Sequence, residues 1–433
     1  SNMQNDLPVL CPEDKQMITA LAAEFEVDFI SLSFARSGED VASARDFLDA
    51  VPGGACSSTK ILAKLETRQS LFNFAEIAST ADGIVLSRGN LGLDVLPEKM
   101  ALAQKAVVLA CNRIGKPALM TRVVDTMVSA PRPTRAEATD VANAVLDGVD
   151  GILLGAETLR GKHPVASVAT VLAICRQAES VFDHSKHFEQ LMSEALDAEE
   201  EGAVGGGSAD ALSGLQRHGS SGSLADSGNG GQPSLTTAVS RMSLGSAHAL
   251  NRLASGGNVS ANGSAAGTGG AGGNPSLGNP SGAPYLSKLE SVASSAVRAA
   301  QKVAAKLIIV YTQSGHAAAL VAKYRPPVPI MTLVIPRLTS DGMSWKLVGR
   351  GVARQALAVR GLLPVLAAPA PSGEALLEEA VMLASSLSLV GPGDHVVVVH
   401  MMRSAYAIKI VTLDDSGASI ANIRPRSLLE LMR

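Results

Sequence analysis

The sequence is poor in aromatic residues and has no long apolar run. Phe, Tyr and Trp make up 3% of the 433 residues, whereas 46% of the residues are hydrophobic. The cores are therefore expected to consist of Ala, Val, Leu and Ile. No apolar segment approaches the roughly 18 residues of a membrane-spanning helix, so the sequence predicts no membrane segment.

Cysteine is also scarce, and neither sign of charge dominates. The four cysteines Cys11, Cys56, Cys111 and Cys175 are widely spaced and form no CxxC pair, which argues against a disulfide framework and a zinc site. Lys and Arg total 37 against 40 Asp and Glu. A chain without basic excess is not expected to bind nucleic acid or an anionic membrane.

The chain divides into three segments by composition. In residues 1–198, short apolar strands alternate with amphipathic helices, a pattern typical of parallel β-α units. The predicted strands are residues 27–34, 60–65, 83–87, 117–120 and 151–154, and the clearest helices are 39–48 and 98–112. Five such units fit either an open doubly wound sheet or part of an eight-stranded barrel.

The second and third segments differ sharply from each other. Residues 199–284 consist mainly of Gly, Ser, Ala and Asn, which favours a disordered linker or insertion because little apolar surface can be buried. Residues 285–433 return to an α/β pattern and predict a smaller second domain. Its expected helices are 289–304 and 317–323, and its expected strands are 307–311, 330–335, 363–366 and 395–400.

Lys64 and Glu66 form the first candidate site. They lie two residues apart at the end of a predicted strand, so their side chains point to the same face. Ligands of parallel α/β folds bind at this end of the strands, and a cation beside a carboxylate suits a phosphate with its metal. An ordinary strand-end ion pair explains the same spacing.

Two further strand ends carry polar residues. Ser87-Arg88-Gly89-Asn90-Leu91-Gly92 predicts a tight turn whose backbone N–H groups could hold an anion, although a plain β-α turn has the same pattern. Thr121 closes the fourth strand, where its hydroxyl could orient or protonate a substrate or could simply be a satisfied polar group. Thr134 and Glu137 predict a capping box at a helix start.

The longer motifs resemble the pyruvate kinase family. PRPTRAEATDVANAVLDG at residues 131–148, AKLET, SRGNLG and GAET occur in the order and spacing of that family. In the third segment SVASSAVRAA, TQSG and AKYRP resemble its C-terminal domain. The segments TRVVDTM and LGAETLRG resemble those of the plant-type cytosolic branch. The resemblance implies about five units of a (β/α)8 barrel followed by a smaller α/β C-terminal domain.

The resemblance also implies an activity and a set of site residues. The family transfers the phosphoryl group of phosphoenolpyruvate to ADP, giving pyruvate and ATP. Lys64 matches the lysine that neutralises the transferring group, and Glu66 matches a ligand of Mg²⁺ or Mn²⁺. Asn90 matches the second metal ligand, as an amide in place of a carboxylate. Arg88, Gly89 and Asn90 match the substrate-binding turn, and Thr121 matches the threonine near the enolate.

Other properties implied by the resemblance depend on the rest of the family's chain. Family members begin with three further barrel strands and a lid domain, which carry the K⁺ ligands and nucleotide contacts and which this sequence lacks. We therefore expect the isolated chain to be inactive, with open sheet edges that favour aggregation or pairing. The first residues, Ser-Asn-Met, are typical of an expression tag. A cytoplasmic location is expected, and a plastid one stays open.

The assembly and regulation of the protein are also expectations from the family. A homo-oligomer, by resemblance a tetramer, is implied. Thr312, Ser314 and Gly315 resemble a loop that holds the phosphate of a sugar-phosphate effector in some relatives, but His316 lacks the basic character of a strong site. Two functions remain open: a glycolytic phosphotransferase, favoured by the retained Lys64 and Glu66, and a non-catalytic regulatory or assembly subunit.

Overall fold

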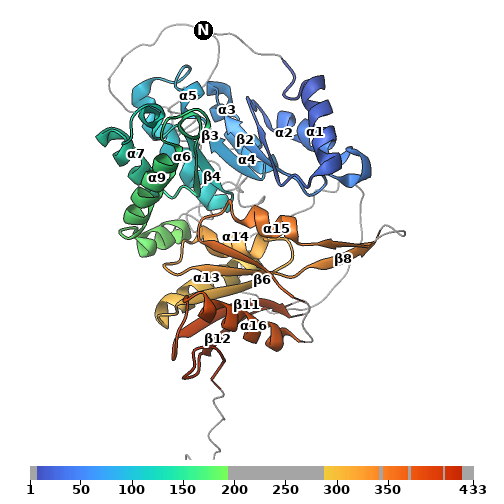
Figure 1. Ribbon diagram of the computed structural model, residues 1–433, viewed down its shortest axis with the longest axis vertical. Helices are drawn as coiled ribbons and strands as arrows, with labels where there is room; N and C mark the ends of the chain where they lie inside the picture. Colours follow the sequence, from blue (N-terminus) through green and yellow to red (C-terminus); the bar gives the residue numbers. More distant parts are fainter. Residues whose placement is uncertain (1–6, 194–286, 341–344, 369–371, 403–404, 422–433) are drawn as a thin grey trace, which may run out of the picture.

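The computed structural model describes residues 7–193, 287–340, 345–368, 372–402 and 405–421. These residues form two α/β domains, one stacked on the other (Figure 1). The first domain comprises residues up to 193, and the second begins at residue 287. The predicted linker, residues 199–284, lies outside the described residues.

The first domain contains a parallel sheet in the order β1-β2-β3-β4-β5. Its strands are β1 (Phe29–Leu32), β2 (Lys60–Leu65), β3 (Gly83–Leu86), β4 (Ala118–Thr121) and β5 (Gly151–Leu153). Each strand pairs with the next one in the chain, as in a barrel. A doubly wound sheet would reverse its order near the middle, so that alternative is wrong and the predicted barrel-type units are confirmed.

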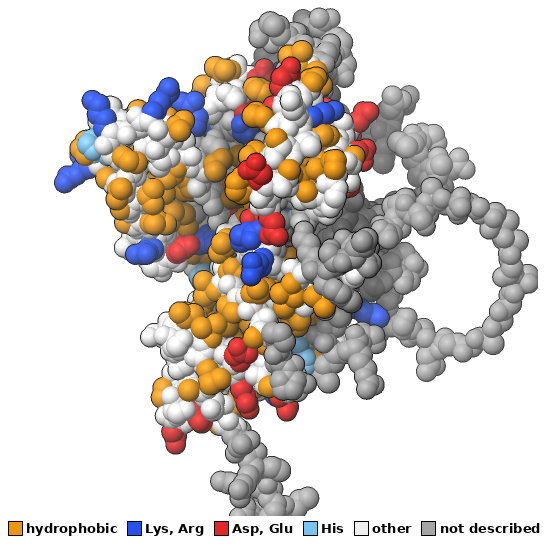
Figure 2. Space-filling model, turned by 45° about the vertical axis from the view of Figure 1, so that its right-hand side comes forward, with side chains coloured by type: hydrophobic (Ala, Val, Ile, Leu, Met, Phe, Trp, Pro, Cys, Tyr) orange, Lys and Arg blue, Asp and Glu red, His pale blue; other side chains and the backbone are white. Residues whose placement is uncertain are grey.

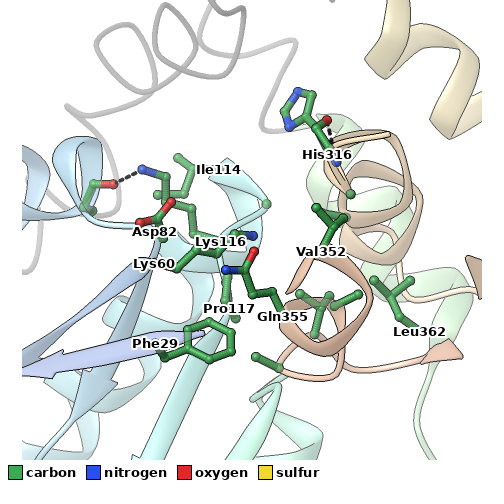
Figure 3. A pocket seen from close by; sticks show the side chains of 18 of the residues that line it. Phe29, Lys60, Asp82, Ile114, Lys116, Pro117, His316, Val352, Gln355 and Leu362 are labelled. Carbon is green, nitrogen blue, oxygen red and sulfur yellow. Dashed lines mark hydrogen bonds between the residues drawn. The ribbon is translucent and has the colours of Figure 1, made fainter. Parts of the chain in front are cut away.

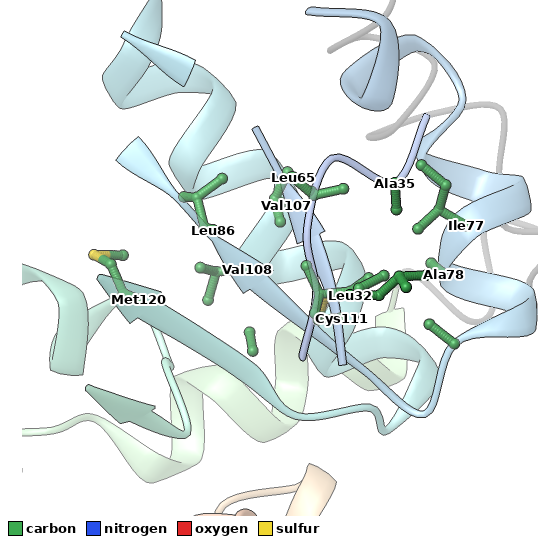
Figure 4. Close-up of a cluster of buried hydrophobic side chains, with 14 of the residues drawn as sticks. Leu32, Ala35, Leu65, Ile77, Ala78, Leu86, Val107, Val108, Cys111 and Met120 are labelled. Atoms are coloured by element: carbon green, nitrogen blue, oxygen red, sulfur yellow. The ribbon is translucent and has the colours of Figure 1, made fainter. Parts of the chain in front are cut away.

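Helices cover one face of this sheet. The longer ones are α1 (Pro12–Glu24), α2 (Gly38–Asp49), α4 (Phe74–Thr80), α6 (Pro97–Ile114), α7 (Arg135–Leu146) and α9 (Pro164–Glu179), and the short ones are α3 (Arg68–Phe72), α5 (Arg88–Leu91) and α8 (Ala156–Leu159). Leu65 and Leu86 of the sheet pack with Val107 and Val108 of α6 in the buried core (Figure 4). Alternate strand residues such as Lys64 therefore face the opposite side, which is the interior of a barrel.

Membrane-crossing potential is limited among the described helices. None of them alone has the length and apolar character of a membrane span. The pair Pro164–Glu179 and His184–Ser193, bent by 72°, meets that criterion only when both helices are taken together.

The second domain has a sheet in the order β10-β7-β6-β11-β12. The strands are β6 (Leu307–Thr312), β7 (Ile330–Val334), β10 (Leu362–Leu366), β11 (His395–Met402) and β12 (Ala405–Thr412), and only β12 is antiparallel to its neighbour. This order reverses between β6 and β11, so this domain is doubly wound. Helices α13 (Lys288–Lys302) and α14 (His316–Lys323) cover one face and α16 (Gly373–Ser386) covers the other.

Several elements of the second domain were not predicted. These are β12, α15 (Arg350–Ala356), α16 and a hairpin of β8 (Arg337–Ser340) with β9 (Trp345–Val348). The hairpin forms a separate two-stranded sheet and projects to one side of the molecule (Figure 1).

Charged side chains hold the two domains together. Arg325 of the second domain is 6% exposed and lies 2.9 Å from Asp150 of the first. Arg354 of α15 lies 2.6 Å from Asp28 and 3.0 Å from Glu26. Figure 2 shows side chains of both signs gathered at the boundary between the domains. These contacts place α15 directly against the ends of the first sheet.

Candidate active site

The predicted site residues lie at one end of the first sheet. Leu65 pairs with Leu86, and Leu86 pairs with Met120. Glu66 and Thr121, which directly follow Leu65 and Met120, are therefore at the same level, two strands apart. Both face the interior side of the sheet, as Lys64 does, because side chains alternate along a strand. The sheet therefore brings Lys64, Glu66 and Thr121 to the carboxyl ends of β2 and β4, as predicted.

The Glu66 carboxylate is the centre of the site. Its side chain is fully buried, and Oε1 lies 3.0 Å from Lys64 Nζ and 2.6 Å from Asn90 Nδ2. The backbone N–H of Phe34 donates to Oε2 at 2.7 Å. Phe34 has a φ of +53°, a conformation that costs free energy in a non-glycine residue and that aims its N–H at the carboxylate.

These contacts keep Glu66 ionised. Burial raises the pKa of its carboxyl, but the hydrogen bonds from Phe34, Lys64 and Asn90, together with the Lys64 charge, outweigh burial and leave the pKa below its usual value. A buried carboxylate held by several donors is a compact negative centre. The site therefore carries an anion beside a cation at neutral pH.

Lys64 has a second contact and remains partly open. Its ammonium lies 3.2 Å from Ser33 Oγ, and 22% of its side chain is exposed. The Lys64–Glu66 pair is thus part of a larger cluster built from the ends of β1, β2 and the β3 turn. An ammonium with remaining donor capacity at a strand end can contact an anionic ligand.

The turn after β3 leads directly into the short helix α5, which Arg88 to Leu91 form. Gly92 has a φ of −67°, so it is not needed there for a left-handed conformation. Gly89 instead allows a close approach, because a Cβ there would lie 2.5 Å from Cδ of Arg122. The first N–H groups of a helix have no carbonyl partner within it, so Gly89 and Asn90 retain donors for an anion.

Arg88 is bound by protein groups. Its guanidinium lies 2.6 Å from Asp140 of α7 and donates to the carbonyl oxygens of Thr121 at 3.3 Å and Arg122 at 2.8 Å. The side chain therefore joins the β3 turn to the end of β4. Its expected contact with substrate stays a prediction.

Thr121 and the predicted capping box complete this region. The Thr121 hydroxyl lies 3.4 Å from the carbonyl oxygen of Leu86, a long contact that leaves its acceptor capacity free for other groups. The capping box at the start of α7 is confirmed: Glu137 N–H donates to Thr134 Oγ1 at 3.2 Å, and Thr134 N–H donates to Glu137 Oε2 at 2.8 Å.

A divalent cation fits the Glu66–Asn90 pair in ligand type. The Asn90 amide nitrogen donates to Glu66 Oε1 at 2.6 Å, so the amide would have to turn its oxygen toward a bound cation. Carboxylate and amide oxygens are ligands of Mg²⁺. The described residues contain no group of three or more His, Cys, Asp and Glu that could hold a metal. Mg²⁺ is usually held by one or two protein side chains, and substrate and water fill its other coordination positions.

The predicted effector loop follows β6 at the switch point of the second sheet. Gly315 has a φ of +83°, and its N–H donates to Thr312 Oγ1 at 2.9 Å. His316 N–H lies 3.4 Å from Ser314 Oγ. The loop therefore has a defined closed shape that leads into α14, as predicted, and its binding of a ligand stays a prediction.

Sequence reasoning did not find several residues of the site. Ser33 and the Phe34 N–H follow β1, and Asp140 lies in α7. The position of Ser33 after an apolar strand was an available signal. No sequence pattern indicates the positive φ of Phe34, because it depends on the finished packing around Glu66.

Comparisons with known proteins agree with this architecture. Residues 1–168 match the barrel-domain model of pyruvate kinase, and residues 290–411 match its alpha/beta-domain model. Cytosolic pyruvate kinase 2 of Oryza sativa is 39% identical over 422 residues, which cover 96% of this chain and 63% of the relative. The cytosolic isozyme of Glycine max is 33% identical, with 94% and 63% covered.

A solved structure gives the same result. The pyruvate kinase of Cryptosporidium parvum matches with a TM-score of 0.67 at 28% identity, covering 95% of this chain and 63% of that one. The chain thus spans somewhat less than two thirds of the length of these relatives. Both domain models, the relatives and the fold lead to one conclusion: the chain belongs to the pyruvate kinase family.

Proposed function

We propose that this chain carries part of the catalytic centre that transfers a phosphoryl group from phosphoenolpyruvate to ADP, giving pyruvate and ATP. The observation that carries the proposal is the cluster in which Lys64 and Asn90 both contact the buried Glu66 carboxylate at the open end of the sheet. A pyruvate kinase of Cryptosporidium parvum has been solved in complex with ADP, which supports the nucleotide as second substrate.

Each residue has a role that follows from its position. The Lys64 ammonium neutralises negative charge on the transferring phosphoryl group, an interaction that strengthens in the transition state. Gly89 and Asn90 offer backbone N–H groups to the substrate carboxylate. In this proposal Thr121, at the level of Glu66, belongs to the path that delivers a proton to the enolate carbon.

Glu66 and Asn90 would hold Mg²⁺ or Mn²⁺. The bound cation supplies further neutralisation of phosphate charge. The Phe34 N–H fixes the orientation of the carboxylate from the side away from Lys64. K⁺ is expected from the family, but we assign it no ligand among the residues of this chain.

The isolated chain is expected to give no turnover. Within the described part of the first sheet, β1 and β5 each have one neighbouring strand, so the interior face that carries Lys64 is not enclosed. A lysine ammonium that is exposed to water stabilises negative charge on a substrate much less than one in an enclosed site does. A location in the cytoplasm agrees with the relatives named cytosolic pyruvate kinases, whereas a homo-oligomeric state is proposed from the family resemblance alone.

The loop of Thr312, Ser314 and Gly315 is a candidate for binding the phosphate of a regulatory sugar phosphate. Its place at the switch point between β6 and β11 supports this role, because ligands of doubly wound sheets bind there. His316 stands where a strong phosphate site would have Lys or Arg, so we expect binding to be weak.

The test of the catalytic proposal uses a chain extended at its N-terminus by the corresponding segment of the Oryza sativa relative. Lys64→Met should lower kcat about a thousandfold with little change in KM for phosphoenolpyruvate, since a lost transition-state donor is worth roughly 3–4 kcal/mol. Lys302→Met, which changes an exposed lysine of α13, is the matched control. Near-normal turnover of the Lys64 variant would mean that the Lys64–Glu66 pair is only a structural salt bridge.

A further inference from the structure

A cavity of about 340 Å³ lies between the two domains, at the end of the first sheet opposite the candidate active site. Its lining includes Phe29 and Lys60 at the starts of β1 and β2, and Val352 and Gln355 of α15 (Figure 3). Lys60 and Lys64 are four residues apart in one strand, roughly 13 Å at the rise of a β-strand. The cavity is therefore separate from the Glu66 cluster.

Contacts across the domain boundary fix the walls of this cavity. Gln355 Nε2 donates to the carbonyl oxygens of Ser58 at 2.7 Å and Asp28 at 3.1 Å. Arg354 Nε lies 2.6 Å from the Asp28 carboxylate. Helix α15 is thus attached to the first sheet beside the cavity, which makes the space a defined feature of the interface.

Three charged side chains line the cavity, and two of them are satisfied by protein groups. The Lys116 ammonium donates to the carbonyl oxygens of three residues at the end of α4, Ala78, Ser79 and Ala81, at 2.6, 2.9 and 2.6 Å. The Asp82 carboxylate accepts from Arg45 Nη2 at 2.6 Å and from the Ile61 N–H at 2.8 Å.

Lys60 is the third charged side chain, and its ammonium has no hydrogen bond or ion pair within the described residues. Burial lowers its pKa, and the nearby Asp82 charge only partly opposes this effect. Lys60 is half-buried, and a cation that is partly removed from water without a protein partner is unfavourable. An anion that enters the cavity would remove that cost.

The rest of the lining is mainly apolar. Phe29, Ile114, Pro117, Val352 and Leu362 contribute to it, and Ser314, Gly315 and His316 of the loop after β6 also form part of the wall. The volume is at the lower end of the range for small-molecule sites. We propose that the cavity binds a small organic oxyanion, a carboxylate or a phosphate monoester with a compact apolar body, whose charged group contacts the Lys60 ammonium.

The position of the cavity implies a regulatory consequence. An occupant would contact β1 and β2 of the first domain and α15 of the second at once. Such a ligand binds the docked arrangement of the domains and not the separated one, so it shifts the population toward docking. The site thereby joins the barrel to the C-terminal domain through the bound molecule.

The test measures binding to the full chain by isothermal titration calorimetry, independently of activity. The probes are benzoate and phenyl phosphate, with benzyl alcohol as the neutral analogue and inorganic phosphate as an anion without an apolar body. At least one of the first two should bind and should raise the melting temperature, and the tighter one identifies the acid class. Failure of both at millimolar concentration, or equal binding of benzyl alcohol or inorganic phosphate, would overturn the proposal.

Variants then locate the site. Lys60→Met should weaken binding roughly tenfold or more, as expected for loss of a hydrogen bond to a charged group, whereas the surface variant Lys302→Met should bind normally. Val352→Phe fills the cavity without altering its charge and should also abolish binding, which covers the case of an unstable Lys60 variant. Binding that survives Val352→Phe, or that Lys60→Met leaves unchanged, overturns the proposal.

Discussion

Asn90 donates its side-chain amide to Glu66 Oε1 at 2.6 Å. The amide therefore acts as a neutral partner in a position where a second carboxylate would face the first. Lys64 contacts the same oxygen at 3.0 Å, so the negative charge of Glu66 is already balanced by one cation. Protein groups alone therefore pair the carboxylate, and the response of the site to a divalent cation can be tested.

Asn90→Asp should make the folded state depend on Mg²⁺. The change removes a donor and places two carboxylates in contact, which should cost about 1–3 kcal/mol of stability in metal-free buffer. Added MgCl₂ should raise the melting temperature of this variant more than that of the parent chain. Asn90→Ser removes the amide without adding charge and is the control. An Asp variant that gains nothing from Mg²⁺ would argue against a metal site at this pair.

Arg88→Lys should destabilise the first domain although the charge is kept. Arg88 reaches Asp140 and the carbonyl oxygens of Thr121 and Arg122 together, and a lysine ammonium lacks the planar fork that spans them. We expect a loss of about 1–3 kcal/mol in chemical denaturation. Asp140→Asn should give a smaller loss because the carbonyl contacts remain. Equal stability of Arg88→Lys and the parent would mean that these contacts contribute little.

The sequence was sufficient for much of the fold and for part of the site. Short apolar runs located all five strands of the first sheet, and the spacing of Lys64 and Glu66 placed both on its interior face. The doubly wound alternative was excluded only by strand order, which depends on long-range pairing. The β12 strand and α16 were missed because their patterns are weaker than that of β6, a continuous apolar run.

The rest of the site depends on contacts between residues distant in the chain. The Phe34 N–H reaches Glu66 across 32 residues, and Arg88 reaches Asp140 across 52. The approach of Arg122 to Gly89, which lies 33 residues earlier, could not be predicted because it is invisible in a local pattern. Lys60 was overlooked for the same reason, since the cavity that it lines forms where the two domains meet.

Stability should fall as the pH drops below the ordinary pKa of histidine, because of His187. Burial, the largest cause, lowers the pKa of this imidazole from 6.5 to about 4, and the charges of Arg325 and Arg360 add to the effect while the Lys323 carbonyl opposes it. The unfolded chain thus binds a proton near pH 6.5 that the folded chain refuses until about pH 4. The part of the folding stability that depends on a neutral His187 is therefore complete above pH 6.5 and is lost as the pH falls toward 4.

The measurement compares urea unfolding of the parent chain and His187→Gln at pH 7.5, 6.5 and 5.5. Gln can still donate to the Lys323 carbonyl, which lies 3.2 Å from His187 Nε2, but it does not titrate. The parent should lose at most about 1.4 kcal/mol per pH unit more than the variant in this window. Parallel pH profiles would show that another group controls the acid response.

Arg325→Met should weaken the docking of the two domains more than any surface charge change. Arg325 Nη1 lies 2.9 Å from Asp150 Oδ1, and Nη2 donates to the Asn112 side chain at 3.0 Å and to the Gly148 carbonyl at 2.8 Å. Arg325 and Asp150 have side chains only 5% and 3% exposed. Removing the cation leaves a buried carboxylate without its charge partner, which typically costs about 3–5 kcal/mol.

The double variant Arg325→Met with Asp150→Asn separates the charge effect from lost packing. It should recover part of the stability, because the orphaned charge is gone while the single amide oxygen of Asn can still accept one of the two hydrogen bonds that Asp150 receives from the backbone N–H groups of Ala118 and Arg360. Arg354→Met, at an exposed interdomain pair, should cost no more than about 1 kcal/mol. Chemical denaturation with separate probes for each domain distinguishes undocking from unfolding. If Arg325→Met and Arg354→Met had equal effects, burial would not be what makes the Arg325–Asp150 contact important.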